Sequence, residues 1–411
     1  MITGAAALSL MMGGWPGLPM GRAVTRTPGR AVLCPPSKGY LLRPVHVGSY
    51  PTSVDVDVAT RRVFVANGSS SSVSILDACR GTVLRTTRVG ETPTVIVVDT
   101  RTARVFVSNA TDGSVSVLNA ATGTLLDTEL LGTFVDQVVV DEHTSRIFVT
   151  FTDDQGTTAI AVLDTVTGKV LRIVPTGSES SLLVLDHVRD HLFSFNIYGH
   201  TAALWILDAR DGTRLRTNDT LGTIPQWATV DEHTGNVFTT VGNRITVFAG
   251  RTGNSVRRID IGHSRHNLVG LAVDPATRRV FVADQGPLDE FHRPTERGRV
   301  AMLDADTGKI RQTVFVPQWP PEVNQAAPAV VAIDAHVGHV FVLSTGRYQE
   351  SGHFADPSYV NILDARTGDL LRSIRVGKSP GTMTVAERLG QLFVLNQEDN
   401  TVSVLETAVG L

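Results

Sequence analysis

Histidines, arginines and carboxylates gather in four polar stretches of the second half of the chain. The stretches are "GHSRHNLVG", "DQGPLDEFHRPTERG", "VPQWPPEVNQAAP" and "STGRYQESGHFADPSY", all between residues 262 and 359. Neutral imidazoles are typical zinc or copper ligands, and the candidates here are His263, His266, His292 and His353. Carboxylates in the same stretches would suit Ca²⁺ instead; these are Asp284, Asp289, Glu290, Glu350 and Asp356.

The same stretches also carry groups that could bind an organic ligand. Arginine guanidinium groups pair with carboxylates or phosphates through two parallel hydrogen bonds, and aromatic rings offer surfaces for stacking. The candidate ligand-binding residues are Arg265, Arg293, Trp319, Glu322, Asn324, Arg347 and Tyr348, with Gln325 and Arg297 nearby. The competing interpretation is that these arginines and acids pair with each other and only order long loops.

A repeat of about 42 residues must position these groups. A phenylalanine inside a Val- and Ile-rich run recurs eight times, at Phe64, Phe106, Phe148, Phe193, Phe238, Phe281, Phe341 and Phe393. Seven residues before each of the first seven stands an aspartate: Asp57, Asp99, Asp141, Asp186, Asp231, Asp274 and Asp334, with Ala386 in the eighth copy. Such self-similarity at a fixed period indicates a repeat architecture.

Each repeat predicts four short strands. In the second copy they are "PTVIVVD", "RVFVSN", "SVSVLN" and "TLLDTELLG", β-branched runs separated by Gly, Asp and Asn turns. A four-stranded antiparallel sheet repeated around an axis is a β-propeller blade. We therefore predict an all-β protein, one eight-bladed propeller over residues 40–411, preceded by an N-terminal tail over residues 1–39. The turn aspartates are predicted to cap turns and not to act chemically.

The first and last parts of the repeat predict how the ring closes. The stretch "YLLRPVHVG" at residues 40–48 resembles a fourth strand without a blade before it, and the last copy lacks a fourth strand. We expect the two to pair and to remove an exposed edge. Cys34 and Cys79, which are the two cysteines of the chain, should then lie on adjacent blades. A disulfide between them would cross-link the closure in an exported protein, and two free thiols are the simpler expectation.

The repeat "VGETPTVIVVDTRTARVFVSNATDGSVSVLNAATGTLL" resembles the YVTN-type β-propeller repeat family. The resemblance extends from about residue 40 to the end. It implies a propeller that is often exported and is used mainly for binding, without implying one activity. The usual ring of that family has seven blades, so seven blades is the family-based alternative to our count of eight.

A second resemblance argues against quinone chemistry. "LDARTGDLL" and "LDTVTGKVL" look like repeats of the eight-bladed pyrroloquinoline-quinone (PQQ) dehydrogenases. The docking tryptophan that follows those repeats and the vicinal cysteine pair of that family have no counterpart here. PQQ is therefore disfavoured as a cofactor, and no cofactor is certain; Zn, Cu or Ca remain candidates.

Insertions affect one face of the predicted ring. The turns from first to second strand and from third to fourth strand share one face, the turn face, and their spacing does not vary. The other connections share the opposite face, the loop face. From the phenylalanine to the end of the third strand takes 13 residues in copies one, two and eight, and 23 in copies six and seven. Long loops grouped on a rigid scaffold are common binding sites.

Composition excludes some partners. Lys and Arg total 37 and Asp and Glu total 40, for a net charge of −3, which gives no electrostatic reason to expect nucleic acid. No apolar run is long enough for a transmembrane helix. The first 20 residues are apolar and rich in small residues, which is typical of an export signal, but no Lys or Arg precedes the run. We read this as a clipped or atypical signal and expect a periplasmic or extracellular protein.

Two functions follow from these patterns. The first is an exported, non-enzymatic propeller that binds a protein or small ligand through the long loops of blades 6 and 7. The second is a metal-dependent hydrolase, lactonase-like by analogy of fold, or an oxidoreductase that uses the same loops. Hydrolysis needs a nucleophile or an activated water, and no Gly-x-Ser-x-Gly motif is present to supply a serine.

Overall fold

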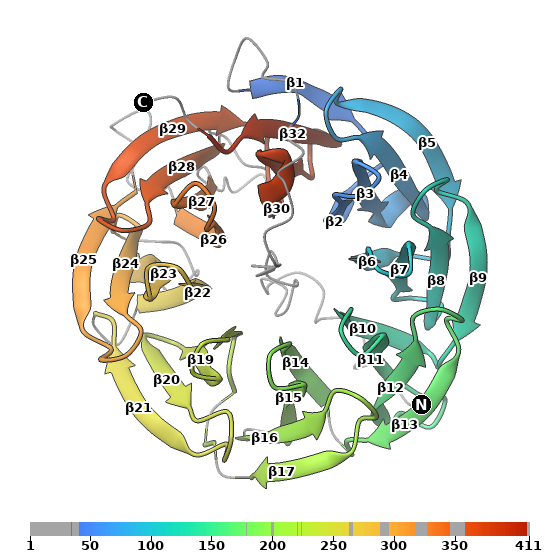
Figure 1. Ribbon diagram of the computed structural model, residues 1–411, viewed down its shortest axis with the longest axis horizontal. Coiled ribbons are helices and arrows are strands. Elements are labelled where there is room, and N and C mark those ends of the chain that lie inside the picture. The colour runs from blue at the N-terminus through green and yellow to red at the C-terminus, as the bar shows by residue number, and fades with distance from the viewer. Residues whose placement is uncertain are drawn as a thin grey trace, which may run out of the picture.

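The computed structural model is a ring of eight four-stranded antiparallel sheets (Figure 1). It describes residue 34 and residues 41–177, 179–198, 201–219, 221–222, 224–262, 266–287, 296–316, 327–345 and 358–408. The predicted eight-bladed propeller is confirmed, and the seven-bladed alternative is wrong. No helix among the described residues is long and apolar enough to cross a membrane.

Blades 1 to 4 follow one another along the chain. Blade 1 consists of β2 (Pro51–Asp57), β3 (Arg62–Asn67), β4 (Ser72–Asp77) and β5 (Thr82–Arg88). Blade 2 consists of β6 (Pro93–Asp99), β7 (Arg104–Asn109), β8 (Ser114–Asn119) and β9 (Leu125–Leu130). Blade 3 consists of β10 (Phe134–Asp141), β11 (Arg146–Thr152), β12 (Thr158–Asp164) and β13 (Val170–Pro175). Blade 4 consists of β14 (Glu179–Asp186), β15 (His191–Tyr198), β16 (Thr201–Asp208) and β17 (Arg214–Asn218).

Blades 5 to 8 complete the ring. Blade 5 consists of β18 (Trp227–Asp231), β19 (Asn236–Val241), β20 (Arg244–Phe248) and β21 (Ser255–Asp260). Blade 6 consists of β22 (His266–Asp274), β23 (Arg279–Pro287), β24 (Arg299–Asp304) and β25 (Ile310–Phe315). Blade 7 consists of β26 (Ala327–Asp334), β27 (His339–Thr345), β28 (Ser358–Asp364) and β29 (Leu370–Val376). Blade 8 consists of β30 (Pro380–Ala386), β31 (Gln391–Asn396), β32 (Thr401–Glu406) and β1 (Leu41–His46). Short 3₁₀ turns connect β3 to β4 at Gly68–Ser70 and β30 to β31 at Glu387–Leu389.

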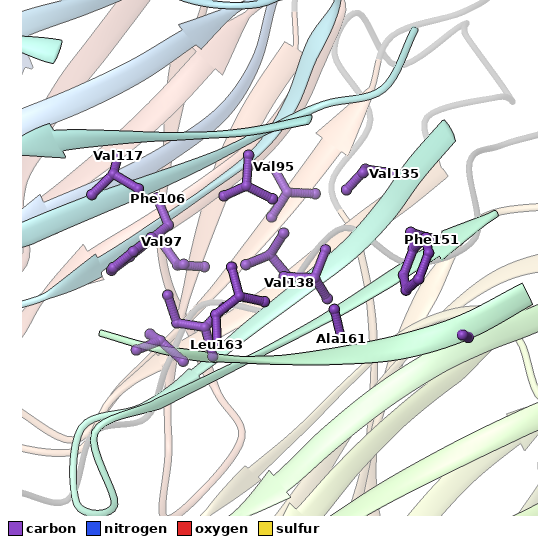
Figure 2. Close-up of a cluster of buried hydrophobic side chains, with 14 residues drawn as sticks. Val95, Val97, Phe106, Val117, Val135, Val138, Phe151, Ala161 and Leu163 are labelled. Atoms are coloured by element: carbon purple, nitrogen blue, oxygen red, sulfur yellow. The ribbon is translucent and has the colours of Figure 1, made fainter. Parts of the chain in front are cut away.

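The repeated phenylalanines form the core between neighbouring blades. All eight lie on the second strand of their blade and are at most 1% exposed. Figure 2 shows one such interface, where Val95, Val97 and Phe106 of blade 2 pack with Val138 and Leu163 of blade 3. The three inner strands of a blade are buried on both faces in this way, whereas the outer strand, such as β5, is mostly exposed. This burial explains why so many positions of the inner strands are apolar rather than alternating.

The turn aspartates cap the turn face, as predicted. Asp57 Oδ1 accepts hydrogen bonds from the amides of Ala59 and Thr60, at 2.9 and 3.3 Å. The following turn of the blade is built similarly: Asp77 Oδ1 accepts from the amide of Arg80, and Gly81 takes the left-handed conformation with φ 61°. These bonds satisfy backbone donors that the sheet leaves unpaired.

The N-terminal strand closes the ring. β1 pairs antiparallel with β32, with Leu41 opposite Leu405 and His46 opposite Thr401, so the predicted closure is confirmed. Cys34 is bonded to Cys79 of blade 1 in a disulfide, and its amide donates to the carbonyl of Leu389 in blade 8 at 3.3 Å. The expectation of two free thiols is therefore wrong, because the closing segment brings both cysteines to one seam between blades 8 and 1.

Candidate functional site

The inner strands of the blades converge on the centre of the ring (Figure 1). A partly open cavity of about 200 Å³ lies there, and every inner strand contributes lining residues. Most of the lining is aliphatic, with Trp227 of blade 5 and the polar side chains of Ser53 and Gln137 among the exceptions. The ionisable side chains of Asp55, His187 and Glu232 also line it. A largely apolar cavity with a small number of placed polar groups is typical of ligand sites.

Short connections on the loop face share one neutral hydrogen-bond network. In blade 2, Asn109 lies three residues after the core phenylalanine and donates from Nδ2 to Ser114 Oγ and Ser116 Oγ, both at 2.9 Å. The same network recurs in blades 1 and 8, built from Asn67, Ser72 and Ser74 and from Asn396, Thr401 and Ser403. All three asparagines are fully buried, so the network closes the ends of the second and third strands.

Blade 6 replaces this neutral network by an ionic one. Asp284 stands three residues after Phe281, where blades 1, 2, 4 and 8 have asparagine, and pairs across the sheet with Arg299. Arg299 Nε donates to Asp284 Oδ2 at 2.8 Å. His266, the first residue of β22, lies with Nδ1 at 2.9 Å from Asp284 Oδ2, and the amide of Gly286 donates to Asp284 Oδ1 at 2.9 Å. We call His266, Asp284 and Arg299 the blade 6 ionic cluster.

The blade 6 ionic cluster is almost entirely removed from water. Asp284 is fully buried and the side chain of His266 is 5% exposed, whereas that of Arg299 is 22% exposed. Because a carboxylate only accepts hydrogen bonds, its contacts with Nδ1 at 2.9 and 3.1 Å assign a proton to that nitrogen of His266. Arg299 Nη2, which is only a donor, lies farther from Nδ1, at 3.4 Å. This carboxylate–histidine arrangement orients histidines that bind metals or transfer protons.

The backbone leaves room for the cluster at one glycine. A Cβ atom at Gly262 would lie 2.3 Å from Arg299 Nη2 and 3.0 Å from His266 Cδ2, and Gly262 has a φ of 84°. Both the close approach and the left-handed conformation require glycine here. The chain therefore enters blade 6 directly over the guanidinium group.

Blade 7 has an insertion of equal length, and the part of it that the structure describes forms no ionic cluster in the corresponding place. Ser344 lies three residues after Phe341, and its hydroxyl accepts from Asn361 Nδ2 at 2.9 Å. Asn361 Oδ1 in turn accepts from Ser373 Oγ at 2.6 Å. A long loop therefore does not by itself require buried charges at its base, and the cluster of blade 6 needs a separate explanation.

Most of the predicted site residues lie outside the described part of the chain. These are His263, Arg265, Asp289, Glu290, His292, Arg293, Trp319, Glu322, Asn324, Gln325, Arg347, Tyr348, Glu350, His353 and Asp356. Of the remainder, the structure brings His266 and Asp284 together, and Arg297 is exposed. Among the described residues no group of three or more His, Cys, Asp or Glu side chains could hold a metal ion, so the metal site stays a prediction.

Arg299 was missed from the sequence. It reads as the first residue of a strand, and its partner is 15 positions away across a long loop. The available signal was Asp284 itself, which breaks the pattern of Asn67, Asn109 and Asn396 three residues after the phenylalanine. An acid in place of a buried amide needs a buried cation close to it.

No family model matches the chain, and no curated protein matches it. Solved structures match it over most of its length. Hydrazine synthase of Kuenenia stuttgartiensis is 15% identical, with a TM-score of 0.57 over 90% of this chain and 100% of that chain. Dihydro-heme d1 dehydrogenase NirN in complex with DHE is 13% identical, with a TM-score of 0.61 over 84% and 68%. Sqt1 of Saccharomyces cerevisiae is 10% identical, with a TM-score of 0.68 over 89% and 98%.

These likenesses show the propeller fold and nothing finer, since unrelated functions share this architecture. The YVTN-type repeat remains a resemblance of sequence. The function must be argued from the site.

Proposed function

We propose that this protein is an exported propeller that binds a small ligand or a protein segment through the loop face at blades 6 and 7. The observation that carries the proposal is the blade 6 ionic cluster. Three charged or titratable groups replace a neutral network that suffices in blades 1, 2 and 8. Burying charge carries a desolvation cost even when the charge is paired, and this charge lies at the base of an inserted loop.

The residues predicted on the inserted loops favour an anionic partner. The carboxylate of Asp284 balances Arg299, so the positive charge that attracts a partner would come from the arginines predicted on the loops, Arg265, Arg293 and Arg347. Carboxylate groups are the natural counterpart of such a set, with Trp319 and Tyr348 as stacking surfaces and Glu322 and Asn324 for polar contacts.

The disulfide supports export. Structural disulfides persist in oxidising compartments and are rare in the cytosol. The Cys34–Cys79 bond therefore favours a periplasmic or extracellular location, as the apolar N-terminal run also does. We propose that location for the mature protein.

A second candidate function is a metal-dependent hydrolase or an oxidoreductase on the same face. The contact between His266 Nδ1 and Asp284 favours it, because carboxylates orient metal-binding histidines in this way. Two of the similar structures are named as a synthase and a dehydrogenase, the latter in complex with DHE. His263, His292 and His353 are the further ligands that we propose for zinc or copper, and loop carboxylates are those for calcium.

Loop replacement tests the first proposal. Residues 285–298 of blade 6 and 345–358 of blade 7 would each be replaced by Ala-Thr-Asp-Gly, the connection at residues 110–113 of blade 2. The matched control replaces residues 152–158 of blade 3 on the same face. Binding of a panel of small mono- and dicarboxylic acids is followed by ligand-observed NMR. We expect the replacements in blades 6 and 7 to lose binding and the blade 3 control to keep it. Binding that is unchanged in the blade 6 and blade 7 replacements as well as in the control contradicts the proposal.

Metal analysis separates the two candidates. Mass spectrometry of the protein, purified without a tag and dialysed without chelator, measures the metal bound per chain. About one zinc, copper or calcium ion per chain that is lost in His266→Ala would favour the enzyme. A folded, metal-free protein that binds carboxylates would favour the scaffold.

A further inference from the structure

The wall of the central cavity changes in polarity from blade to blade. In each blade one residue of the inner strand lies opposite the core phenylalanine of the second strand, as Asp55 lies opposite Phe64 and Thr384 opposite Phe393. Those that line the cavity are Asp55, Val97, Val139, Val184, Thr229, Ala272 and Thr384. At this level the wall is therefore aliphatic in blades 2, 3, 4 and 6 and polar in blades 1, 5 and 8.

Blade 1 uses its polar inner-strand groups to bind blade 2. Ser53 Oγ accepts from the amide of Ile96 at 3.2 Å, and Asp55 Oδ2 accepts from the amide of Val98 at 2.8 Å. Asp55 Oδ1 accepts from the amide of Val56, also at 2.8 Å. A carboxylate offers about four lone pairs. Asp55 can therefore hold the two strands together and still accept a hydrogen bond from a molecule in the cavity.

Blade 8 has hydroxyl groups in the same two places. Thr382 and Thr384 stand four and two residues before the end of β30, as Ser53 and Asp55 do in β2, and these inner strands are neighbours in the ring (Figure 1). Both threonines line the cavity and are 7% exposed. Neither hydroxyl has a hydrogen-bond partner among the described residues. Because buried hydroxyls are normally paired, these two are suited to a partner inside the cavity.

The cavity wall carries negative charge. Asp55 and Glu232 are the carboxylates among the lining residues that the structure describes, and none of those residues is a lysine or an arginine. Arg189 donates to the backbone carbonyl of Glu232 at 2.9 Å, but its guanidinium group is paired with the buried carboxylate of Asp186 at 3.0 Å. The charge of Arg189 is therefore balanced outside the wall.

His187 does not reverse the charge of the wall. It is the one basic side chain among the described lining residues, and its Nδ1 lies 3.4 Å from Oδ1 of the buried Asp141. Even a protonated imidazole would bring one positive charge against the two negative charges of Asp55 and Glu232. A ligand that displaces water from these carboxylates should therefore bring positive charge of its own.

The size of the cavity restricts the ligand to a small molecule. The volume is about 200 Å³, and a dry apolar cavity of about 150 Å³ is enough to bind benzene. Val139, Val184 and Ala272 offer an apolar surface to a ring or a short chain. A primary ammonium group has three donors, which suits the carboxylate of Asp55 and the threonine hydroxyls of the neighbouring blade.

We propose that the central cavity binds a small primary amine, with the ammonium group at Asp55 and Thr384 and the apolar body against blades 3, 4 and 6. The described lining residues belong to the inner strands and the turns after them. Replacing the loops at residues 285–298 and 345–358 leaves these residues in place. The cavity is thus a second site, and its charge preference is opposite to that proposed for the loop face.

Three probes that share one ring test the charge preference. Benzylamine, benzyl alcohol and benzoate are titrated into the unmodified protein by isothermal titration calorimetry at about pH 7, where a primary amine is protonated. We expect benzylamine to bind about tenfold more tightly than benzyl alcohol, because a hydrogen bond between charged groups is stronger than a neutral one. Benzoate should not bind in the cavity.

Substitutions in the wall locate the binding. Ala272→Phe fills the cavity from blade 6 and should abolish binding of benzylamine and of benzyl alcohol, and Val184→Phe does the same from blade 4 if the first variant does not fold. Asp55→Asn keeps an acceptor for the amide of Val98 but removes the charge, so benzylamine should lose its advantage. Asp260→Asn removes an equal charge from the outer strand β21, where the side chain is 61% exposed, and should change none of the affinities.

Four results would overturn the proposal. The first is that no probe binds, which would leave the cavity to water. The second is that benzylamine binds no more tightly than benzyl alcohol. The third is benzylamine binding that persists in a folded Ala272→Phe or Val184→Phe variant, which would place the site elsewhere. The fourth is benzoate binding that these variants abolish. Carboxylic acids bound by the inserted loops are unaffected by cavity filling, so this proposal and the loop-face proposal fail separately.

Discussion

His266 Nδ1 lies 2.9 Å from Asp284 Oδ2, across the first two strands of blade 6. In blade 2 the place of Asp284 is held by Asn109, which needs only two serine hydroxyls. The same backbone therefore accepts either a neutral or an ionic network. The choice of the ionic one raises the question of what the charge is for, and variants can separate stability from binding.

Asp284→Asn should destabilise the protein strongly. The new amide would face the donors of Arg299 and His266, and removing one partner of a buried ion pair costs about 3 kcal/mol or more. Urea unfolding measures the change. The double variant Asp284→Asn with Arg299→Ser rebuilds the pair Asn109–Ser114 of blade 2 and should recover much of the loss. If the double variant is as unstable as the single one, the two networks are not interchangeable as the structure indicates.

The core phenylalanines should dominate the stability of each interface. Phe106→Ala opens a cavity between blades 2 and 3, and we expect a loss of roughly 3 to 5 kcal/mol in the free energy of unfolding. Leu125, on the outer strand of the same blade and 43% exposed, is the matched control. Its replacement by alanine should change the free energy by about 0.5 kcal/mol or less. Equal losses in the two variants would contradict the packing shown in Figure 2.

Reduction of the disulfide should loosen the ring. The bond spans 45 residues, for which the chain-entropy relation gives a stabilisation of about 4 kcal/mol. A thiol reductant should lower the melting temperature of the unmodified protein. It should not lower that of Cys34→Ala with Cys79→Ala, whose melting temperature is already reduced. If the reductant still lowers the melting temperature of the double variant, the reductant acts at a place other than the Cys34–Cys79 disulfide.

Stability in acid should depend on Asp141. Burial alone would raise the pKa of Asp141, but hydrogen bonds from His187 and Thr144 hold it below its usual value. Because the pKa of Asp141 is lower in the folded state than in the unfolded state, the ionised carboxylate stabilises the fold at pH values above the unfolded pKa. This contribution to stability is lost as pH falls through the folded pKa. Thr144→Val, which removes the donated hydroxyl, should therefore flatten the pH dependence of unfolding below about pH 4. An unchanged dependence would show that Thr144 does not hold the carboxylate.

The repeat carries most of the fold in its sequence. Phe64 to Phe393 mark eight second strands, and the aspartate seven positions earlier marks the end of the inner strand in blades 1 to 7. These signals are local, because each depends on one strand and one turn. The pairing of β1 with β32 was also predictable, since an unpaired fourth strand at one end matched a missing one at the other.

Contacts between blades were harder to predict. Arg299 acts on Asp284 across a loop, and Glu387 reaches Ala335 from the next blade. Both depend on how side chains meet in space, which the spacing within one repeat does not contain. The two cysteines are a further case: sequence put them on adjacent blades but could not decide between thiols and a bond. The candidate residues on the long loops lie outside the described chain, so their roles stay predictions.

The closure of the ring also sets the order in which the chain can fold. Leu41 pairs with Leu405, which is 364 positions later (405 − 41), so β1 has no partner until blade 8 is complete. Contacts of such sequence separation form slowly. The bond from Cys34 to Cys79 requires only blade 1, whose strands all precede residue 89. Once blade 1 has formed under oxidising conditions, the first strand is tethered beside the place where the last blade will arrive, and completing the ring becomes a local docking step.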